Sequence, residues 1–193
     1  MTLPMLKVYL AGPEVFLPDF GKPVFDAKKA MCAAFGFEGV SPMDGDLDLE
    51  GLAPFQQGIA IYRGNLAHMD GCNAVIANMT PFRGVSMDAG TAFEMGYMAA
   101  RGKPVLGYTH AVDGYAERCV RYYGQGAGSV LDGYSAGTSI ERFDMADNLM
   151  MVGAVDVAGF RVRSVSAPDG EELTSLAGFE QCLADLKKVR GAG

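Results

Sequence analysis

The sequence predicts an α/β fold in which a parallel sheet carries helices on both faces. Short apolar runs, the length of buried strands, alternate with longer segments of helical periodicity, and the connections between them are short. The chain has 193 residues, of which 49% are hydrophobic and 20% charged, which is enough for one sizeable core. No internal repeat or linker interrupts it, so we expect residues 1–193 to form a single domain.

The first part of the chain has the pattern of a strand, a helix and a second strand. Residues 6–11 form an apolar run that ends at a Gly-Pro turn. Small and apolar residues recur at helical spacing over 22–35, and Gly36 follows as the expected C-cap. Residues 37–40 form a short strand that ends at a Ser-Pro pair.

The middle of the chain begins with an acidic, glycine-containing loop at residues 43–50. A helix is expected over 54–69, and a strongly apolar strand over 73–79 follows it. After a loop at 80–85, the next helix is expected over 88–101, because Gly and Pro residues come directly after that segment.

Toward the C-terminus, residues 105–108 form the next expected strand. Residues 124–138 are rich in Gly and Ser. We expect a flexible loop there rather than a phosphate-binding loop, because no clear strand precedes it and no clear helix opens from it. Helices are expected over 140–152 and 173–189.

Charge and residue types exclude several classes of protein. The net charge of −7 argues against a nucleic-acid partner, because binding a polyanion requires a basic surface. The two histidines are not at metal-ligand spacing, so no metal site is expected. The four cysteines form no CxxC pair, and neither a signal peptide nor a membrane span is recognisable. We therefore expect a cytoplasmic protein with reduced thiols and no membrane partner.

The most informative segment is PFRGVSMDAGTAFEMG at residues 81–96. It follows an expected central strand, at the sheet edge where open parallel α/β sheets bind their ligands. Its helix is small or apolar nearly all round except for Thr91 and Glu94. No Lys or Arg lies three or four residues from Glu94 to pair with a buried carboxylate. Glu94 is therefore either a structural residue bonded to a distant group, or a carboxylate facing a cleft as nucleophile or acid/base.

Asp88 stands at the expected N-terminus of the same helix, where Asp is a favoured cap residue. Capping alone would explain it. However, Asp88 and Glu94 also place two carboxyl groups in different environments within two helical turns. Such pairs divide the duties of nucleophile and proton transfer between them.

These residues resemble the nucleoside 2-deoxyribosyltransferase family over roughly residues 5–155. The similar segments are YLAGPEVF at 9–16, CNAVIANMTPFRG at 72–84, MDAGTAFEMGYMAARGKPV at 87–105 and, more weakly, DNLMM at 147–151. The resemblance implies a flavodoxin-like (Rossmann-like) sheet of five parallel strands with helices on both faces. It also implies transfer of 2-deoxyribose between nucleobases, a reaction of nucleotide salvage that requires no metal or organic cofactor.

The resemblance also implies roles for three catalytic residues. Glu94 stands where the family has its nucleophile, which attacks the anomeric carbon and forms a covalent glycosyl intermediate. Asp88 matches the acid that exchanges a proton with the base, and Tyr9 matches the tyrosine whose hydroxyl orients the nucleophile. Two displacements retain the anomeric configuration. From the sequence alone, Tyr9 fits a core strand residue equally well.

The implied partners are deoxynucleosides, free nucleobases and further copies of this chain. Asn65 matches a position near the sugar. Asn148 matches an asparagine that reaches a sugar hydroxyl across a subunit interface, so a homo-oligomer, a dimer or larger, is expected. By itself, Asn148 also fits a polar residue of a helix or turn. The remaining candidates for substrate binding are Gly12 and, around the base, Phe16, Asp44 and Met87.

Two other functions remain open from the sequence. An N-glycoside hydrolase of nucleosides or deoxynucleosides, or of their 5′-monophosphates, could use the same Glu94. The loop GPEVFLPD at 12–19 is acidic and apolar, which suits an unphosphorylated sugar, although Arg83 could reach a phosphate. The second possibility is a non-catalytic nucleotide-binding module, which would bind its ligand without turnover.

Overall fold

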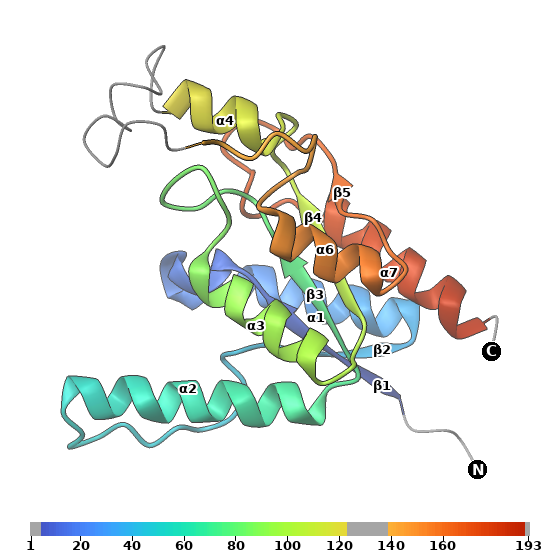
Figure 1. Ribbon diagram of the computed structural model, residues 1–193. Coiled ribbons are helices and arrows are strands. Elements are labelled where there is room, and N and C mark those ends of the chain that lie inside the picture. The colour runs from blue at the N-terminus through green and yellow to red at the C-terminus, as the bar shows by residue number, and fades with distance from the viewer. Residues whose placement is uncertain (1–4, 123–138, 192–193) are drawn as a thin grey trace.

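A five-stranded parallel sheet forms the centre of the molecule in the computed structural model, which describes residues 5–122 and 139–191 (Figure 1). The strand order is β2-β1-β3-β4-β5, and every neighbouring pair is parallel. The strands are β1 (Leu6–Ala11), β2 (Phe37–Val40), β3 (Ala74–Asn78), β4 (Val105–Thr109) and β5 (Arg163–Ser164). The predicted α/β class, with five parallel strands, is confirmed.

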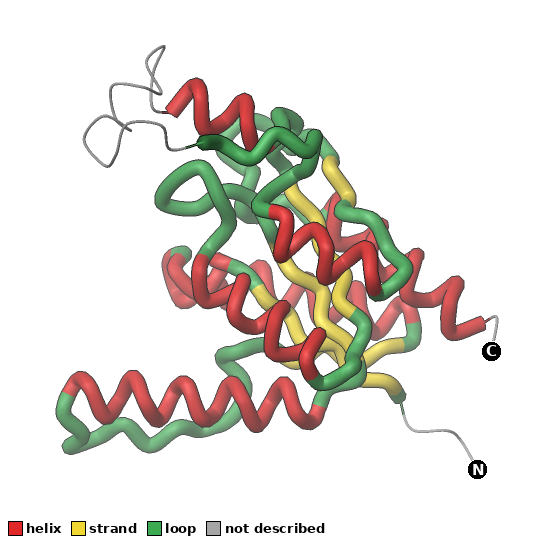
Figure 2. Tube along the Cα trace, viewed as in Figure 1, coloured by secondary structure: helices red, strands yellow, loops and turns green. Residues whose placement is uncertain are grey.

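Helices cover both faces of this sheet. The helices of the described residues are α1 (Lys22–Phe35), α2 (Pro54–Gly71), α3 (Ala89–Ala100), α4 (Tyr115–Tyr122), α6 (Leu149–Val157) and α7 (Ala177–Gly191). α1 and α7 pack together on one face, and α3 and α6 pack together on the other. Figure 2 shows α2 and the loop before it extending together beyond the rest of the molecule.

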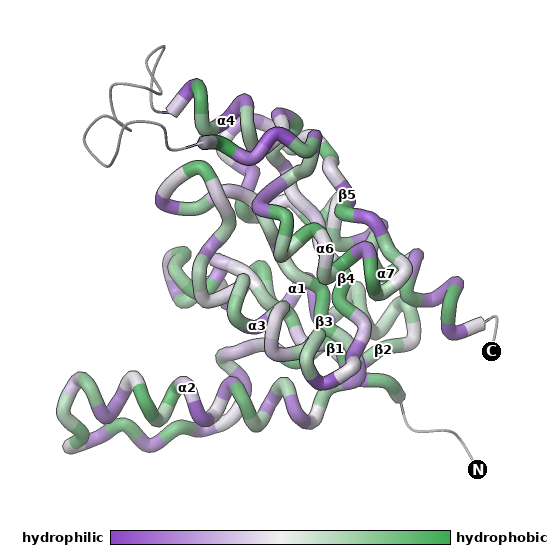
Figure 3. Tube along the Cα trace, viewed as in Figure 1, coloured by the Kyte–Doolittle hydropathy of each residue, from purple (hydrophilic) through white to green (hydrophobic). Residues whose placement is uncertain are grey.

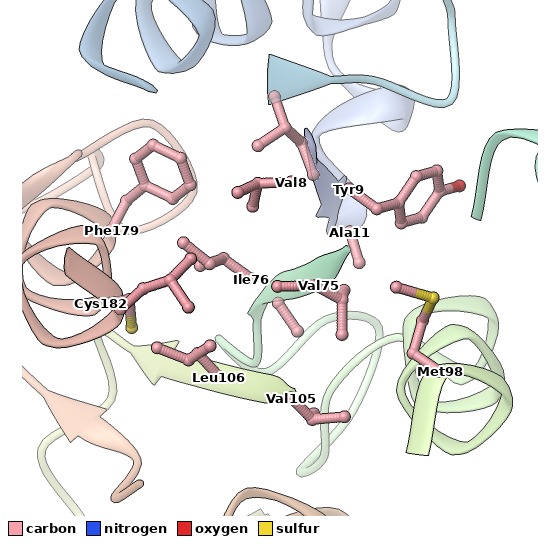
Figure 4. Close-up of a cluster of buried hydrophobic side chains, with 14 of the residues drawn as sticks. Val8, Tyr9, Ala11, Val75, Ile76, Met98, Val105, Leu106, Phe179 and Cys182 are labelled. Carbon is pink, nitrogen blue, oxygen red and sulfur yellow. The ribbon is translucent and has the colours of Figure 1, made fainter. Parts of the chain in front are cut away.

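The core lies on both sides of the three central strands because successive side chains of a strand point to opposite faces. All five residues of β3 and of β4 are buried, as expected for strands covered on both faces. In Figure 4, Val8, Ile76 and Leu106 point toward Phe179 and Cys182 of α7. Tyr9 and Val75 point to the other face, toward Met98 of α3. Along α2, by contrast, hydrophobic and hydrophilic residues alternate (Figure 3).

The N-terminal elements agree closely with the sequence. β1, α1 and β2 have the predicted bounds, and Gly36 ends α1 with a left-handed φ of 87°. The predicted helices at 54–69 and 88–101 correspond to α2 and α3, and the acidic loop at 43–50 has no regular structure. Between β1 and α1 lie two short 3-10 turns, Pro13–Phe16 and Pro18–Gly21, which were not predicted.

The C-terminal elements differ from the prediction. The helix expected over 140–152 is wrong, because α6 begins only at Leu149. Asp144 has a left-handed φ of 55°, which no helix accommodates, and the Asn148 side chain caps α6 by accepting from Met150 N–H. The helix expected over 173–189 begins at Ala177. α4 and β5 were not predicted, and the loop expected at 124–138 lies outside the described residues.

Candidate active site

Glu94 lies on the face of α3 that packs against the sheet and is only 9% exposed. Its Oε1 accepts a hydrogen bond of 2.7 Å from the Tyr9 hydroxyl of β1. Within the described part of the chain, Oε2 accepts no hydrogen bond, and no cation pairs with the carboxylate. One oxygen is thus held by Tyr9, while the other has no hydrogen-bond donor in the described residues.

Burial raises the pKa of the Glu94 carboxyl to about 7. The hydrogen bond from Tyr9 lowers this pKa, whereas the charges of Asp88 and Glu14 raise it. The pKa of Tyr9 itself lies far above its ordinary value because of burial and the Glu94 charge. Tyr9 therefore stays protonated and donates to Glu94, and Glu94 can change its charge near neutral pH.

Asp88 is the N-cap of α3, as the sequence predicts. Its Oδ2 accepts from Thr91 N–H at 2.9 Å and from Thr91 Oγ1 at 3.1 Å. Both hydrogen bonds use one oxygen, and no hydrogen bond to Oδ1 is found among the residues that the structure describes. Asp88 is half-buried beside the more deeply buried Glu94. The two carboxyl groups therefore have different environments, which is the condition for dividing their roles.

The loop between β3 and α3 carries an aromatic stack at the carboxyl edge of the sheet. The ring of Phe82 stacks on Phe16, with centroids 5.1 Å apart and planes inclined by 13°. The Arg83 guanidinium lies 4.4 Å from the Phe16 centroid and 4.7 Å from that of Phe82. Phe16 is half exposed, so a planar group could still approach its ring.

Met87 and Asp44 are held by neighbouring segments. Met87 is 6% exposed, and its N–H donates to Asp147 at 3.0 Å. Asp44 forms an ion pair with Lys29 and accepts from the N–H of Ser41 at 3.0 Å. Although burial opposes it, these bonds together lower the pKa of Asp44.

A buried ion pair lies directly beneath the first loop. Glu14 and Lys28 are both completely buried, and their charged atoms are 2.5 Å apart. Asn78, the last residue of β3, donates to the same Glu14 oxygen at 2.8 Å. A side chain on Gly12 would place its Cβ 1.9 Å from Glu14 Oε2, so a larger residue there would have to displace the Glu14 carboxylate. The acidic loop seen in the sequence therefore has its Glu14 charge turned inward and paired.

The two candidate asparagines occupy different parts of the molecule. Asn65 lies on α2, and its Oδ1 is buried without a hydrogen-bond donor among the described residues. Asn148 is the N-cap of α6, and its amide nitrogen donates to Glu141 at 2.8 Å. No hydrogen bond joins either residue to Glu94 among the residues that the structure describes. Tyr9 is thus bonded to Glu94, and Asp88 is near enough for its charge to raise the pKa of Glu94, whereas no hydrogen bond links Asn65 or Asn148 to this group in the described residues.

Sequence reasoning missed a second buried ion pair, between Arg118 and Asp147, that holds the loop before Asp88. The Arg118 Nη2 atom lies 3.5 Å from Asp147 Oδ2, and the exposed fractions of the two side chains are 9% and 0%. The two residues are 29 positions apart. No local pattern links them, although the charged Asp147 beside the apolar α6 was a usable signal.

Other features of the surface lie away from these residues. A hollow of about 600 Å³ between the β4 end, α6 and β5 contains none of the candidates. Within residues 5–122 and 139–191, no three His, Cys, Asp or Glu side chains are grouped to hold a metal ion. In the same ranges no helix has the length and apolar content needed to cross a membrane.

Known proteins are similar to this chain over most of its length. Residues 8–150 match the family model described as nucleoside 2-deoxyribosyltransferase. An uncharacterised protein of Schizosaccharomyces pombe is 40% identical over 126 residues, which are 64% of this chain and 59% of that protein. The chain therefore spans about three fifths of the length of this curated relative.

Two solved structures share the fold. A 2-desoxiribosyltransferase from Leishmania mexicana aligns with a TM-score of 0.59 and 24% identity, covering 95% of this chain and 97% of that one. A conserved protein from Enterococcus faecalis V583 aligns with a TM-score of 0.52 and 20% identity, covering 97% and 99%. At these identities the alignments support the arrangement of strands and helices.

Proposed function

The chain belongs to the nucleoside 2-deoxyribosyltransferase family, and from this premise we propose that it transfers 2-deoxyribose from one nucleobase to another. The observation that carries the proposal is the Tyr9–Glu94 pair, a buried carboxylate held through one oxygen beside a second carboxyl group, Asp88. The proposed substrates of this chain are deoxynucleosides and free nucleobases.

The first displacement is an attack of Glu94 Oε2 on the anomeric carbon of the deoxyribose. The bond from that carbon to the base nitrogen breaks, and its electron pair leaves with the base. A base that leaves as an anion is a poor leaving group, so Asp88 donates a proton to a ring nitrogen as the bond breaks. The hydrogen bond from Tyr9 keeps Glu94 oriented throughout and favours its charged form.

The second displacement reverses these steps with another base. A ring nitrogen of the incoming base attacks the anomeric carbon of the glycosyl ester, the bond from that carbon to Glu94 breaks so that Glu94 leaves as a carboxylate, and Asp88 takes the proton that the base loses. Two inversions at one carbon retain its configuration. The net reaction exchanges one base for another on the same deoxyribose, and its equation contains no oxidant, metal or cofactor.

We propose further that the working unit is a homo-oligomer in which Asn148 reaches the sugar of a neighbouring protomer. Large hydrophobic side chains lie exposed on α2, α3 and the start of α6. They include Phe55, which is 79% exposed, and Met150, which is 71% exposed. Exposed apolar residues of this size on neighbouring helices favour contact with another chain. Asn65 Oδ1, which is buried without a donor, would accept from a sugar hydroxyl.

A mixing experiment tests this shared site. Glu94→Gln and Asn148→Ala homo-oligomers should each lose most activity, whereas oligomers reassembled from both contain sites in which the two intact residues meet. Recovery of activity on mixing supports the shared site. Failure to recover in demonstrably mixed oligomers contradicts it.

A hydrolase of deoxynucleoside 5′-monophosphates is the second candidate, and one observation favours it. The Arg83 guanidinium lies over two aromatic rings at the carboxyl edge without an ion-pair partner in the described chain. A phosphate would satisfy that charge. The third candidate from the sequence is a non-catalytic nucleotide-binding module. It would differ from the transferase and the hydrolase because it would bind its ligand without turnover.

The test is incubation with 2′-deoxyinosine, with and without adenine, resolved by chromatography. Formation of 2′-deoxyadenosine only when adenine is present supports base exchange. A mass increase of one deoxyribosyl group on the protein, absent from Glu94→Gln, supports the covalent step. Glu180→Gln, an exposed change on α7, is the matched control and should retain activity.

Three other results point elsewhere. Free hypoxanthine and deoxyribose in amounts that adenine does not change indicate the hydrolase. Turnover of 2′-deoxyinosine 5′-monophosphate in preference to the nucleoside indicates the same. Tight nucleotide binding that Glu94→Gln leaves intact, without any turnover, indicates the binding module.

A further inference from the structure

One buried carboxylate connects the loop before α3 with the residue that begins α6. Asp147 is 1% exposed and lies immediately before Asn148. Its Oδ2 accepts from Met87 N–H at 3.0 Å, and its Oδ1 accepts from the hydroxyl of Ser86 and from Asn148 N–H. Asp147 therefore binds the two residues directly before Asp88 and the residue directly after itself.

Arg118 of α4 completes this connection from the other side. Its Nε donates to Val85 O at 2.9 Å and its Nη2 to Ala146 O at 2.8 Å. Its Nη1 donates to Asp113 O at 2.6 Å, which anchors the guanidinium to the loop after β4. Arg118 thus holds the same two loop segments as Asp147. In the first segment it binds Val85, the residue before Ser86, and in the second it binds Ala146, the residue before Asp147.

From this geometry we infer that Asp147 and Arg118 are positioning residues for Asp88. The inference rests on the proposed function, in which Asp88 transfers the proton of the base. The loop from residue 80 to Asp88 is neither helix nor strand, so α3 alone fixes only its end. Contacts to Val85, Ser86 and Met87 set the path by which the chain enters the N-cap position. A shift of about 1 Å in a group that transfers a proton can lower a rate about a hundredfold.

The inference predicts which chemical step is slowed. Asp88 is needed when the base must be protonated to leave, as in 2′-deoxyinosine. It is not needed for 7-methyl-2′-deoxyguanosine, whose positively charged base leaves as a neutral molecule. Loss of Asp147 should therefore slow cleavage of the first substrate much more than that of the second. A purely structural role would slow both equally, because it would lower the fraction of folded enzyme.

The experiment measures base release in a single turnover with enzyme in excess. We expect Asp147→Asn to slow 2′-deoxyinosine cleavage by about 10- to 100-fold and 7-methyl-2′-deoxyguanosine cleavage by less than about threefold. Ser86→Ala removes one contact and leaves the ion pair intact. It should give the same selectivity with a smaller loss, and it decides the question if Asp147→Asn does not fold. Asp185→Asn, on α7, breaks an ion pair with Arg163 of β5 and serves as the control, with no selectivity expected.

The outcomes separate the two proposals. Equal losses on both substrates in Asp147→Asn and Ser86→Ala overturn the positioning role and leave the proposed function standing. Failure of the unmodified protein to cleave either substrate overturns both. Glu94→Gln should abolish cleavage of both substrates, because each requires the nucleophile.

Discussion

The Tyr9 hydroxyl lies 2.7 Å from Oε1 of Glu94, although 85 positions separate these residues in the chain. β1 supplies the hydroxyl and α3 supplies the carboxylate, so the sheet and one helical layer meet in a single hydrogen bond. Burial raises the pKa of Glu94 to about 7 and this hydrogen bond lowers it. The packing of α3 on β1 therefore determines the charge of Glu94 near neutral pH.

Replacing Tyr9 by Phe should shift the pH dependence of kcat/KM to higher pH. The nucleophile must be deprotonated, so activity should rise with pH through a midpoint near 7 in the unmodified protein. Without the hydrogen bond that lowers the pKa of Glu94, the midpoint moves upward. The loss should be about tenfold or more at pH 6 and smaller at pH 8. Tyr97→Phe, on the outer side of the same helix, should keep the original midpoint, and an unshifted Tyr9→Phe profile contradicts the prediction.

Glu94→Gln should stabilise the protein at high pH. The pKa of Glu94 is raised from 4.5 to about 7 by folding, so its stability contribution is fully present below pH 4.5 and is lost as pH rises through 7. Gln stays neutral throughout. The difference in free energy of unfolding between variant and parent should grow from near zero at pH 4 to at most about 3 kcal/mol at pH 8. Urea unfolding at both pH values measures it, and a difference independent of pH would sink the prediction.

Substituting Glu14 by Gln should destabilise the fold by about 3–5 kcal/mol, because it leaves the charge of Lys28 buried without its partner. The double variant Glu14→Gln, Lys28→Met removes the stranded charge and should recover most of that loss. Urea unfolding of both single variants and the double variant gives the coupling. A loss of unfolding free energy in the double variant equal to the sum of the losses in the two single variants would contradict the coupling between Glu14 and Lys28 that their 2.5 Å separation indicates.

Gly178→Ala should lower stability by about 1–3 kcal/mol, even though Ala favours helices. The added Cβ would lie 2.6 Å from Tyr108 Cδ2 and 2.8 Å from its Cβ, at the contact of α7 with β4. Gly58→Ala in α2 is the control, since a Cβ there meets nothing within 4 Å. It should raise the free energy of unfolding by about 0.5–1 kcal/mol, and the melting temperature should rise with it. A rise in melting temperature for both variants would contradict the prediction, because it would mean that β4 moves to accommodate the added Cβ without loss of stability.

Asn148→Ser separates the cap from the proposed sugar contact. Ser caps helices about as well as Asn, so stability should change little, whereas Asn148→Ala should cost about 1 kcal/mol. If the amide contacts substrate, both variants should raise KM for the deoxynucleoside. Thermal unfolding and steady-state kinetics on the three proteins decide this. A KM unchanged in Asn148→Ser would restrict Asn148 to its role as the cap of α6.

The N-terminal half could be predicted because its signals are local. The apolar run at 6–11 and the short segment at 37–40 are bounded by turn residues, and Gly36 and Asp88 are caps that a few neighbouring residues define. Glu94 stood out because it is the one carboxylate in a helix that is apolar nearly all round. In each case the whole signal lies within one strand or one helix, the longest being the 12 residues of α3 for Glu94.

The rest depends on contacts between distant segments. β5 has two residues, too few for any hydrophobic pattern, and it exists because it pairs with Tyr108 and Thr109. The start of α6 was placed too early, although Asn148 before an apolar run is a cap signal that could have corrected it. The burial of Glu14 could not be foreseen, because its partner Lys28 lies on another element and looks like an ordinary helix-surface residue.

The strand order β2-β1-β3-β4-β5 also has a consequence for synthesis on the ribosome. β1 is made first but becomes an interior strand, because β2 and β3 lie on either side of it. One edge of β1 has no partner until β3 is translated, which happens only after the whole of α2. The side chain of Tyr9 stays exposed until α3 packs on β1. Unpaired strand edges recruit other chains. The nascent protein is therefore most open to aggregation while residues 41–100 are being translated.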